Sequence, residues 1–171
     1  NALHDELSGY PGGQAARPER TDVVVPLRYR ADHAELCFLS ITAVVGTPMD
    51  VTVEDYDQLF ATNVKGPYFA IQRAGRVLPD GGRISALSTL NTVVPGPGIS
   101  LYAASKAALE QFVKIAAREY GPRGITVNTV SPGFIESPAV AAVLSRERIA
   151  AVVPMKRAGK PEEVADLVAF L

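Results

Sequence analysis

The chain has 171 residues, of which 47% are hydrophobic and 20% charged, and its formal net charge is −1. This balance predicts a single globular domain over residues 1–171 and excludes a disordered chain. The interspersed, nearly neutral charge does not support binding to nucleic acid or to a membrane surface. No apolar run reaches the roughly 20 residues that a membrane-spanning helix needs.

Cysteine and histidine are scarce in this chain. Cys37 is the single cysteine and can form no internal disulfide, which favours a cytoplasmic location. The first residues, "NALHDELSGYPGG", lack the basic start and apolar block of a signal peptide. His4 and His33 are the only histidines and lie far from any second group of ligands, so no metal site is expected.

The first half of the chain is expected to contain a helix stub, a turn-rich stretch and two strands, at residues 1–7, 8–20, 21–29 and 34–45. Thr52 is followed three residues later by Asp55, which is the pattern of a capping box. It predicts a helix that continues to about Leu78. Along it an apolar stripe recurs at four-residue steps, formed by Tyr56, Phe60, Val64 and Tyr68.

The second half alternates strands and helices. We expect a strand, a long helix, a strand and a helical segment, at residues 83–89, 100–120, 124–133 and 137–152. A last helix opens at Pro161, where proline and the acidic residues beside it suit a first helical turn. The alternation predicts an α/β fold with a parallel sheet.

Polar residues gather at one expected edge of that sheet. Ser88 and Thr89 close the strand at 83–89, and ligands of open parallel sheets bind beyond the carboxyl ends of the strands. Tyr102 and Lys106 stand at i and i+4 on the helix that follows, and so share a face. A lysine ammonium one turn away favours the phenolate, so this pair can perform acid/base chemistry near neutral pH. The same spacing also arises by chance, with Tyr102 covering a helix start and Lys106 in solvent.

Five stretches in order resemble landmarks of the short-chain dehydrogenase/reductase family: "NVKGPYFAIQ", "GGRISALST", "YAASKAALEQF", "REYGPRGITVNTVSPGFIES" and "PMKRAGKPEEVADLVAFL". The resemblance covers about residues 44–171, and it is strongest to the branch of 3-oxoacyl-carrier-protein reductases and related polyol and steroid dehydrogenases. It implies a Rossmann-like, doubly wound parallel sheet in three αβα layers. Residues 1–38 match the family poorly.

The resemblance implies a catalytic set of Asn63, Ser88, Tyr102 and Lys106, with Thr89 as the alternative to Ser88. It implies cofactor contacts through Tyr102, Lys106, Pro132, Gly133, Ile135 and Ser137. In such a set Tyr102 exchanges the proton, while Lys106 lowers the tyrosine pKa and holds the nicotinamide ribose. Ser88 positions the substrate oxygen, and Asn63 anchors a water that leads protons toward Lys106.

The resemblance further implies an oxidoreductase that uses NAD or NADP to interconvert a small-molecule carbonyl and a secondary alcohol. It also implies a homo-oligomer formed through the helices at 53–78 and 100–120. The segment 134–153 corresponds to the lid over the substrate. A related epimerase or dehydratase that uses the same tyrosine and lysine is a weaker alternative.

The sequence departs from the family at its N-terminal side. The glycine-rich turn Thr-Gly-x-x-x-Gly-x-Gly, which cradles the cofactor pyrophosphate, has no counterpart here. The usual first βαβ unit is therefore expected to be lacking. The last strand is expected to be lacking as well, because the sequence stops at Leu171 inside a helix, as in a chain truncated at both ends. A catalytically silent fragment that acts as a binding or oligomerisation module is the alternative function. The sequence does not decide between NAD and NADP.

Overall fold

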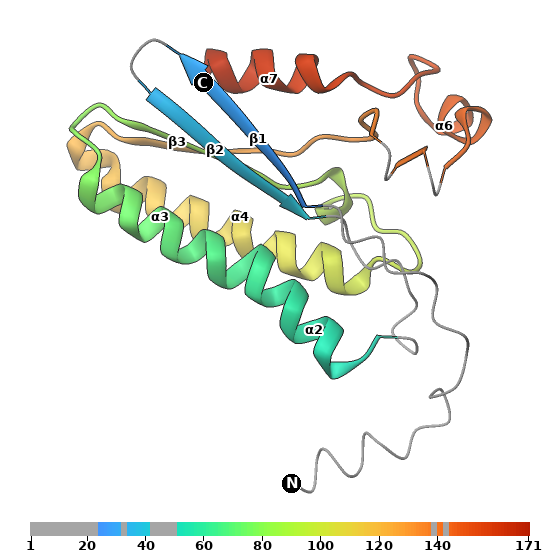
Figure 1. The fold of residues 1–171 in the computed structure, drawn as a ribbon, viewed down its shortest axis with the longest axis horizontal. Coiled ribbons are helices and arrows are strands. Elements are labelled where there is room, and N and C mark those ends of the chain that lie inside the picture. Colours follow the sequence, from blue (N-terminus) through green and yellow to red (C-terminus); the bar gives the residue numbers. More distant parts are fainter. Residues whose placement is uncertain (1–23, 32–33, 42–50, 138–139, 142–143) are drawn as a thin grey trace, which may run out of the picture.

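The computed structural model of the chain describes residues 24–31, 34–41, 51–137, 140–141 and 144–171 (Figure 1). The helix stub and the turn-rich stretch expected at 1–20 lie outside the described residues, as do His4 and His33. Side chains are described from residue 51 onward. That residues 1–171 form one domain stays a prediction.

Two parallel strands position the functional edge of the molecule. Strand β3 is Arg83–Leu87 and strand β4 is Thr126–Val130, and they pair in parallel from Arg83↔Thr126 to Leu87↔Val130. Helices α3 and α4 lie together on one side of these strands, and α7 lies on the other side (Figure 1). Strands between helical layers confirm the α/β architecture expected from the alternating pattern.

The helix expected from Thr52 to Leu78 forms, with an irregularity at its centre. It consists of α2 (Val53–Phe60), a π-helical turn (Ala61–Lys65) and α3 (Gly66–Val77). The capping box is present, because the Thr52 hydroxyl accepts the Asp55 N–H at 3.1 Å and the Asp55 carboxylate accepts the Thr52 N–H at 3.2 Å. These two bonds satisfy backbone donors that a helix start would otherwise leave open.

Helix α4 (Ser100–Tyr120) spans the residues predicted for it. Its buried face carries Leu109, Val113 and Ala116, which pack against Ile71 of α3 and Val127 of β4. Each fully buried leucine, isoleucine or valine side chain contributes roughly 1.5–3 kcal/mol. After Tyr120 the chain makes a short 3₁₀ turn and then turns back at Gly124, whose φ of 68° is a left-handed conformation that suits glycine.

The strands predicted at 21–29 and 34–45 form at Val24–Ala31 (β1) and Ala34–Ile41 (β2), but not as members of the parallel sheet. They pair antiparallel with each other, in a two-stranded sheet separate from β3 and β4. Neither strand therefore belongs to the parallel sheet of β3 and β4. The two residues between these strands are too few for the crossover that parallel strands require.

The segment expected to be helical at 137–152 is helical in two places among the described residues. Val140 and Ala141 are helical, with the Ala141 N–H bonded to the Ser137 carbonyl at 3.0 Å, and helix α6 then runs from Arg146 to Val152. Ser145 is extended and caps α6 with its Oγ, which accepts the Arg148 N–H at 3.3 Å, so α6 starts as a separate helix. Helix α7 (Pro161–Phe170) opens with proline as predicted.

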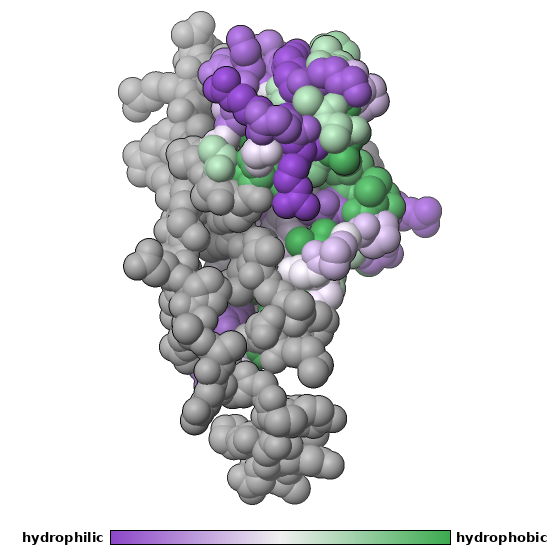
Figure 2. All heavy atoms as spheres, turned by 90° about the vertical axis from the view of Figure 1, so that its right-hand side faces the viewer, coloured by the Kyte–Doolittle hydropathy of each residue, from purple (hydrophilic) through white to green (hydrophobic). Residues whose placement is uncertain are grey.

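Figure 2 views the end of the molecule that lies at the right of Figure 1. Hydrophilic side chains gather at the level of α6 and α7, with hydrophobic ones among and below them. In the described parts of the chain, no helix combines the length and apolarity needed to cross a bilayer.

Candidate active site

The chain segments that leave β3 and β4 are joined at the carboxyl edge of the strands. The Ser88 N–H donates to the Val130 carbonyl at 2.8 Å, and the Leu90 N–H donates to the Pro132 carbonyl at 2.9 Å. Pro132 and Gly133 therefore lie beside the segment that carries Ser88 and Thr89, as expected of two parallel strands that end at one edge.

Lys106 is buried at this edge, with 6% of its surface exposed. It lies on α4, and its ammonium Nζ donates to the carbonyl of Leu87, the last residue of β3, at 3.0 Å. Burial lowers the pKa of Lys106 below its usual value, because the charged form loses solvation. The alternative left open by the sequence, in which Lys106 lies in solvent, is thus excluded.

Tyr102 lies one turn before Lys106 on the same face of α4. Burial raises the pKa of its phenol, and a hydrogen bond from the Thr89 side chain acts in the opposite direction but does not offset it. The expectation that Lys106 lowers the pKa of Tyr102 is not met here, because that pKa is raised. The physical reason is that the Lys106 ammonium binds the end of β3, while Tyr102 loses solvation.

Ser88 and Thr89 are both buried but face different partners. The Ser88 hydroxyl donates to Glu110 Oε1 at 2.6 Å. The Thr89 side chain bonds Tyr102, and its Oγ1 accepts the Asn91 N–H at 3.3 Å. Of the two hydroxyls that the sequence left open, the one beside Tyr102 is that of Thr89.

Asn63 lies in the π-helical turn and is 3% exposed. Its Nδ2 donates to Ser105 Oγ at 3.1 Å, and Ser105 Oγ donates to the Tyr102 carbonyl at 2.7 Å. Asn63 is thereby tied to the backbone of the helix that carries Tyr102 and Lys106. π-turns are often found at functional sites.

The remaining residues expected to contact a cofactor follow β4. Gly133 is exposed, and Ile135 forms an isolated parallel bridge with Gly159. Ser137 accepts the Val140 N–H on its Oγ at 3.1 Å, so its hydroxyl organises the start of the next segment. The structure brings Pro132 and Gly133 to the edge occupied by Thr89; the Gly159 bridge and the Val140 bond instead tie Ile135 and Ser137 to later segments.

Two site residues were not predicted from the sequence, Ser105 and Glu110. Glu110 stands one further turn along the face of Tyr102 and Lys106, and this i+4 spacing was a signal that could have found it.

Among the residues with described side chains, no group of three His, Cys, Asp or Glu could hold a metal ion.

Comparison with known proteins places this chain in a family. The family model described as enoyl-(acyl carrier protein) reductase matches residues 37–171. A cyclic-di-GMP-binding biofilm dispersal mediator protein of Escherichia coli K12 is 42% identical over 130 residues, covering 75% of this chain and 55% of that protein. A human (3R)-3-hydroxyacyl-CoA dehydrogenase is 31% identical over 187 residues, covering 96% of this chain and 72% of that enzyme.

The solved structure of an angucycline C-6 ketoreductase with bound NADP superposes with a TM-score of 0.71 and 39% identity, covering 76% of this chain and 51% of that one. The fold is therefore Rossmann-like, and the chain belongs to the short-chain dehydrogenase/reductase family of oxidoreductases. The chain spans about half the length of the bacterial relative and of the ketoreductase.

Proposed function

We propose that this chain carries the catalytic part of a nicotinamide-dependent oxidoreductase that interconverts a carbonyl and a secondary alcohol. The observation that carries the proposal is the arrangement at the carboxyl edge of β3, where Tyr102 bonds Thr89 and a buried Lys106 lies one turn away. Buried titratable groups with displaced pKa values are typical of active sites.

The residues present fit the nicotinamide end of such a cofactor. The Lys106 ammonium has three hydrogens, and the Leu87 carbonyl accepts one of them, so two remain to bind ribose hydroxyls. Tyr102, Pro132 and Gly133 lie at the same edge and would hold the ring and its carboxamide. The bound NADP of the angucycline ketoreductase supports the same class of cofactor.

The chemistry follows from the positions of the polar atoms. A bound nicotinamide supplies or takes up the hydride. Tyr102 keeps its proton at neutral pH, because burial raises its pKa, and it can give that proton to a substrate oxygen during reduction. Thr89 donates a hydrogen bond toward the Tyr102 oxygen and lies where it can also position the substrate oxygen. Asn63 and Ser105 hold the start of α4 in place.

The pyrophosphate end of the cofactor has no counterpart in this sequence, which contains no Thr-Gly-x-x-x-Gly-x-Gly turn. Binding energy from remote parts of a ligand positions the reacting group, so affinity and turnover depend on how residues 1–50 contribute. The cytoplasmic location stays a prediction.

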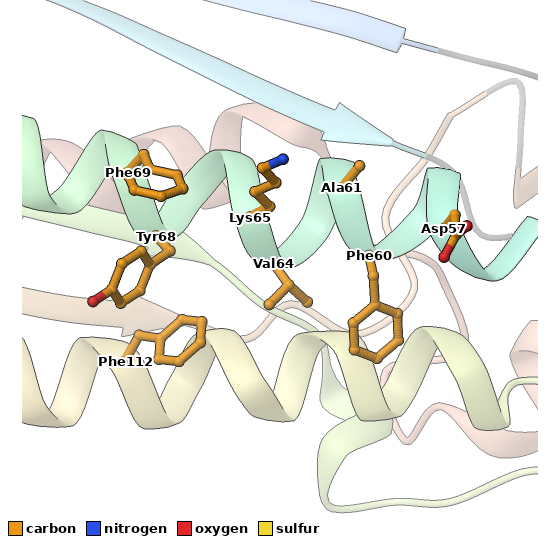
Figure 3. A pocket seen from close by; sticks show the side chains of 8 residues that line it. All are labelled: Asp57, Phe60, Ala61, Val64, Lys65, Tyr68, Phe69 and Phe112. Atoms are coloured by element: carbon orange, nitrogen blue, oxygen red, sulfur yellow. The ribbon is translucent and has the colours of Figure 1, made fainter.

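A second candidate function is an oligomerisation module, and an apolar groove favours it. A hollow of about 610 Å³ lies between α2–α3 and α4, lined by Asp57, Phe60, Ala61, Val64, Lys65, Tyr68, Phe69 and Phe112 (Figure 3). Tyr68 and Phe112 meet edge to face at 5.0 Å. None of the candidate catalytic residues lines this groove. Such an apolar surface suits association with a second copy of the chain through the helices at 53–78 and 100–120.

The test of the proposed function is a fluorescence titration of the purified chain with NADH and with NADPH, followed by a screen of carbonyl substrates. Saturable binding, together with turnover that Tyr102→Phe abolishes, is the expected result. A folded chain that binds neither cofactor at millimolar concentration would leave the oligomerisation module as the function.

A further inference from the structure

Glu110 connects three separate segments at the candidate site. Its Oε1 atom lies 2.6 Å from Ser88 Oγ, 2.8 Å from Thr92 Oγ1 and 3.4 Å from Ser131 Oγ. Ser88 follows β3, Thr92 lies in the 3₁₀ turn after it, and Ser131 follows β4. One side chain of α4 thus joins the ends of both parallel strands.

The carboxylate is suited to this role because it stays ionised. Burial raises the pKa of Glu110, but hydrogen bonds from the three hydroxyls, together with the charge of Lys114, lower it below its usual value. Hydrogen bonds to an ionised acceptor are roughly twice as strong as neutral ones.

Thr89 lies between two of the residues that Glu110 holds. Ser88 precedes it, and the Thr92 hydroxyl lies 3.0 Å from the Thr89 carbonyl as well as 2.8 Å from Glu110. The Thr92 hydroxyl has one hydrogen, so it donates to one of these oxygens at a time. The Asn91 N–H occupies an acceptor position of Thr89 Oγ1, which leaves the Thr89 hydrogen free to point at Tyr102.

We propose that Glu110 is a positioning residue: by binding the Ser88, Thr92 and Ser131 hydroxyls it turns Ser88 away from the reacting groups and holds Thr89 against Tyr102. The role in turnover rests on the proposed oxidoreductase function. The role in placing Thr89 does not, and the experiment measures that placement directly.

The experiment follows the Tyr102 phenol by NMR in the whole chain labelled with ¹³Cζ-tyrosine, with the resonance assigned by its loss in Tyr102→Phe. Thr89→Val removes the hydroxyl that bonds Tyr102, so it displaces this resonance at neutral pH and raises the Tyr102 pKa further. Glu110→Ala is expected to change the Tyr102 resonance and the Tyr102 pKa in the same direction. In the double variant Thr89→Val/Glu110→Ala these two changes do not exceed those of Thr89→Val alone, since both substitutions act through one hydrogen bond.

Two variants separate positioning from a loss of structure. Glu110→Gln keeps an oxygen acceptor and is expected to stay closer to the parent than Glu110→Ala. Glu119→Ala removes an exposed glutamate from the same helix and leaves the Tyr102 resonance unchanged. If Glu110→Ala does not fold, Glu110→Gln and Ser88→Ala, which removes one of the three donors, are expected to give smaller displacements in the same direction. Unchanged Tyr102 resonances in the folded Glu110 and Ser88 variants overturn the proposal.

A kinetic measurement separates this proposal from the proposed function. Glu110→Ala is expected to lower kcat by on the order of 10- to 100-fold, as a displaced catalytic group does, and to leave the KM for the nicotinamide cofactor unchanged. A parent chain without hydride transfer contradicts the proposed function alone, since the Tyr102 resonance still reports on Glu110. A rise in the cofactor KM with unchanged kcat contradicts the positioning role.

Discussion

Thr89 and Ser88 are adjacent hydroxyl residues with different partners, and this difference predicts different mutational effects. Thr89→Val keeps the shape of the side chain but removes the hydrogen bond to Tyr102, so we expect kcat/KM for carbonyl reduction to fall by on the order of 100-fold. Ser88→Ala breaks only the bond to Glu110 and should cost less. Steady-state kinetics of both variants measures the ranking, and the reverse ranking would return the catalytic role to Ser88.

Lys106 gives a prediction about stability and pH. Its pKa is lowered in the fold relative to the unfolded chain, so the native state sheds this proton first as the pH rises. The stability that Lys106 contributes is therefore greatest above the pKa that it has in the unfolded chain. This contribution is lost as the pH falls through the pKa of Lys106 in the folded chain. Relative to Lys106→Met, the native chain should gain stability between pH 7 and about pH 9.5, below the usual range of tyrosine titration. Urea unfolding at both pH values measures this, and a constant difference would contradict it.

Much of the candidate site could be predicted because its residues follow local patterns. Tyr102 and Lys106 share a helix face at a fixed spacing, and Ser88 and Thr89 end a recognisable strand. The choice between the two hydroxyls depends on Glu110, a contact across 22 residues. Burial of Tyr102 likewise arises only in the tertiary structure, which is why the direction predicted for its pKa, a lowering by Lys106, was wrong.

At the scale of elements, the sequence predicts helices better than irregularities. The capping box at Thr52 and the proline at the start of α7 are local signals, and both helices begin where these signals stand. The π-helical turn has no such signal, and the bond of its Asn63 to Ser105 spans 42 residues. The pairing of β1 with β2 also departs from the expected parallel sheet, since strand patterns specify a conformation and not a partner.

The contact between α3 and α4 depends on a glycine. A Cβ atom on Gly75 would lie 2.2 Å from the Tyr120 ring, whose hydroxyl donates to the Ile71 carbonyl at 3.4 Å. Gly75→Ala should therefore lower the free energy of unfolding by roughly 1–3 kcal/mol, measured by urea denaturation.

Gly66→Ala is the matched control on the same helix. A Cβ atom there would meet the Ala61 carbonyl at 3.4 Å, an ordinary contact, so alanine should be neutral or stabilise by up to about 1 kcal/mol. If the two glycine variants were equally stable, the close approach of Tyr120 to α3 would be wrong.

For the whole molecule, the groove between α2–α3 and α4 predicts self-association. Its exposed rim includes Phe69, which is 53% exposed and lies edge to face with Tyr68 at 5.3 Å. In a two-fold symmetric dimer each residue is buried twice, so Phe69→Lys removes the burial of two phenylalanine rings, roughly 3–6 kcal/mol. The dissociation constant should rise by at least about 100-fold, measured by sedimentation velocity over a range of concentrations.

Val77→Lys is the control for this prediction, because Val77 is an exposed apolar residue of the same helix that does not line the groove. A lysine there also suits the carboxyl end of α3. The control should leave the assembly intact, while Phe69→Lys dissociates it. A monomeric parent chain, or equal behaviour of the two variants, would show that the groove does not bind a second copy. The groove and the edge of β3 share no lining residue. If the parent chain associates and the Phe69→Lys monomer keeps an intact active site, the groove is separate from the chemistry at that edge.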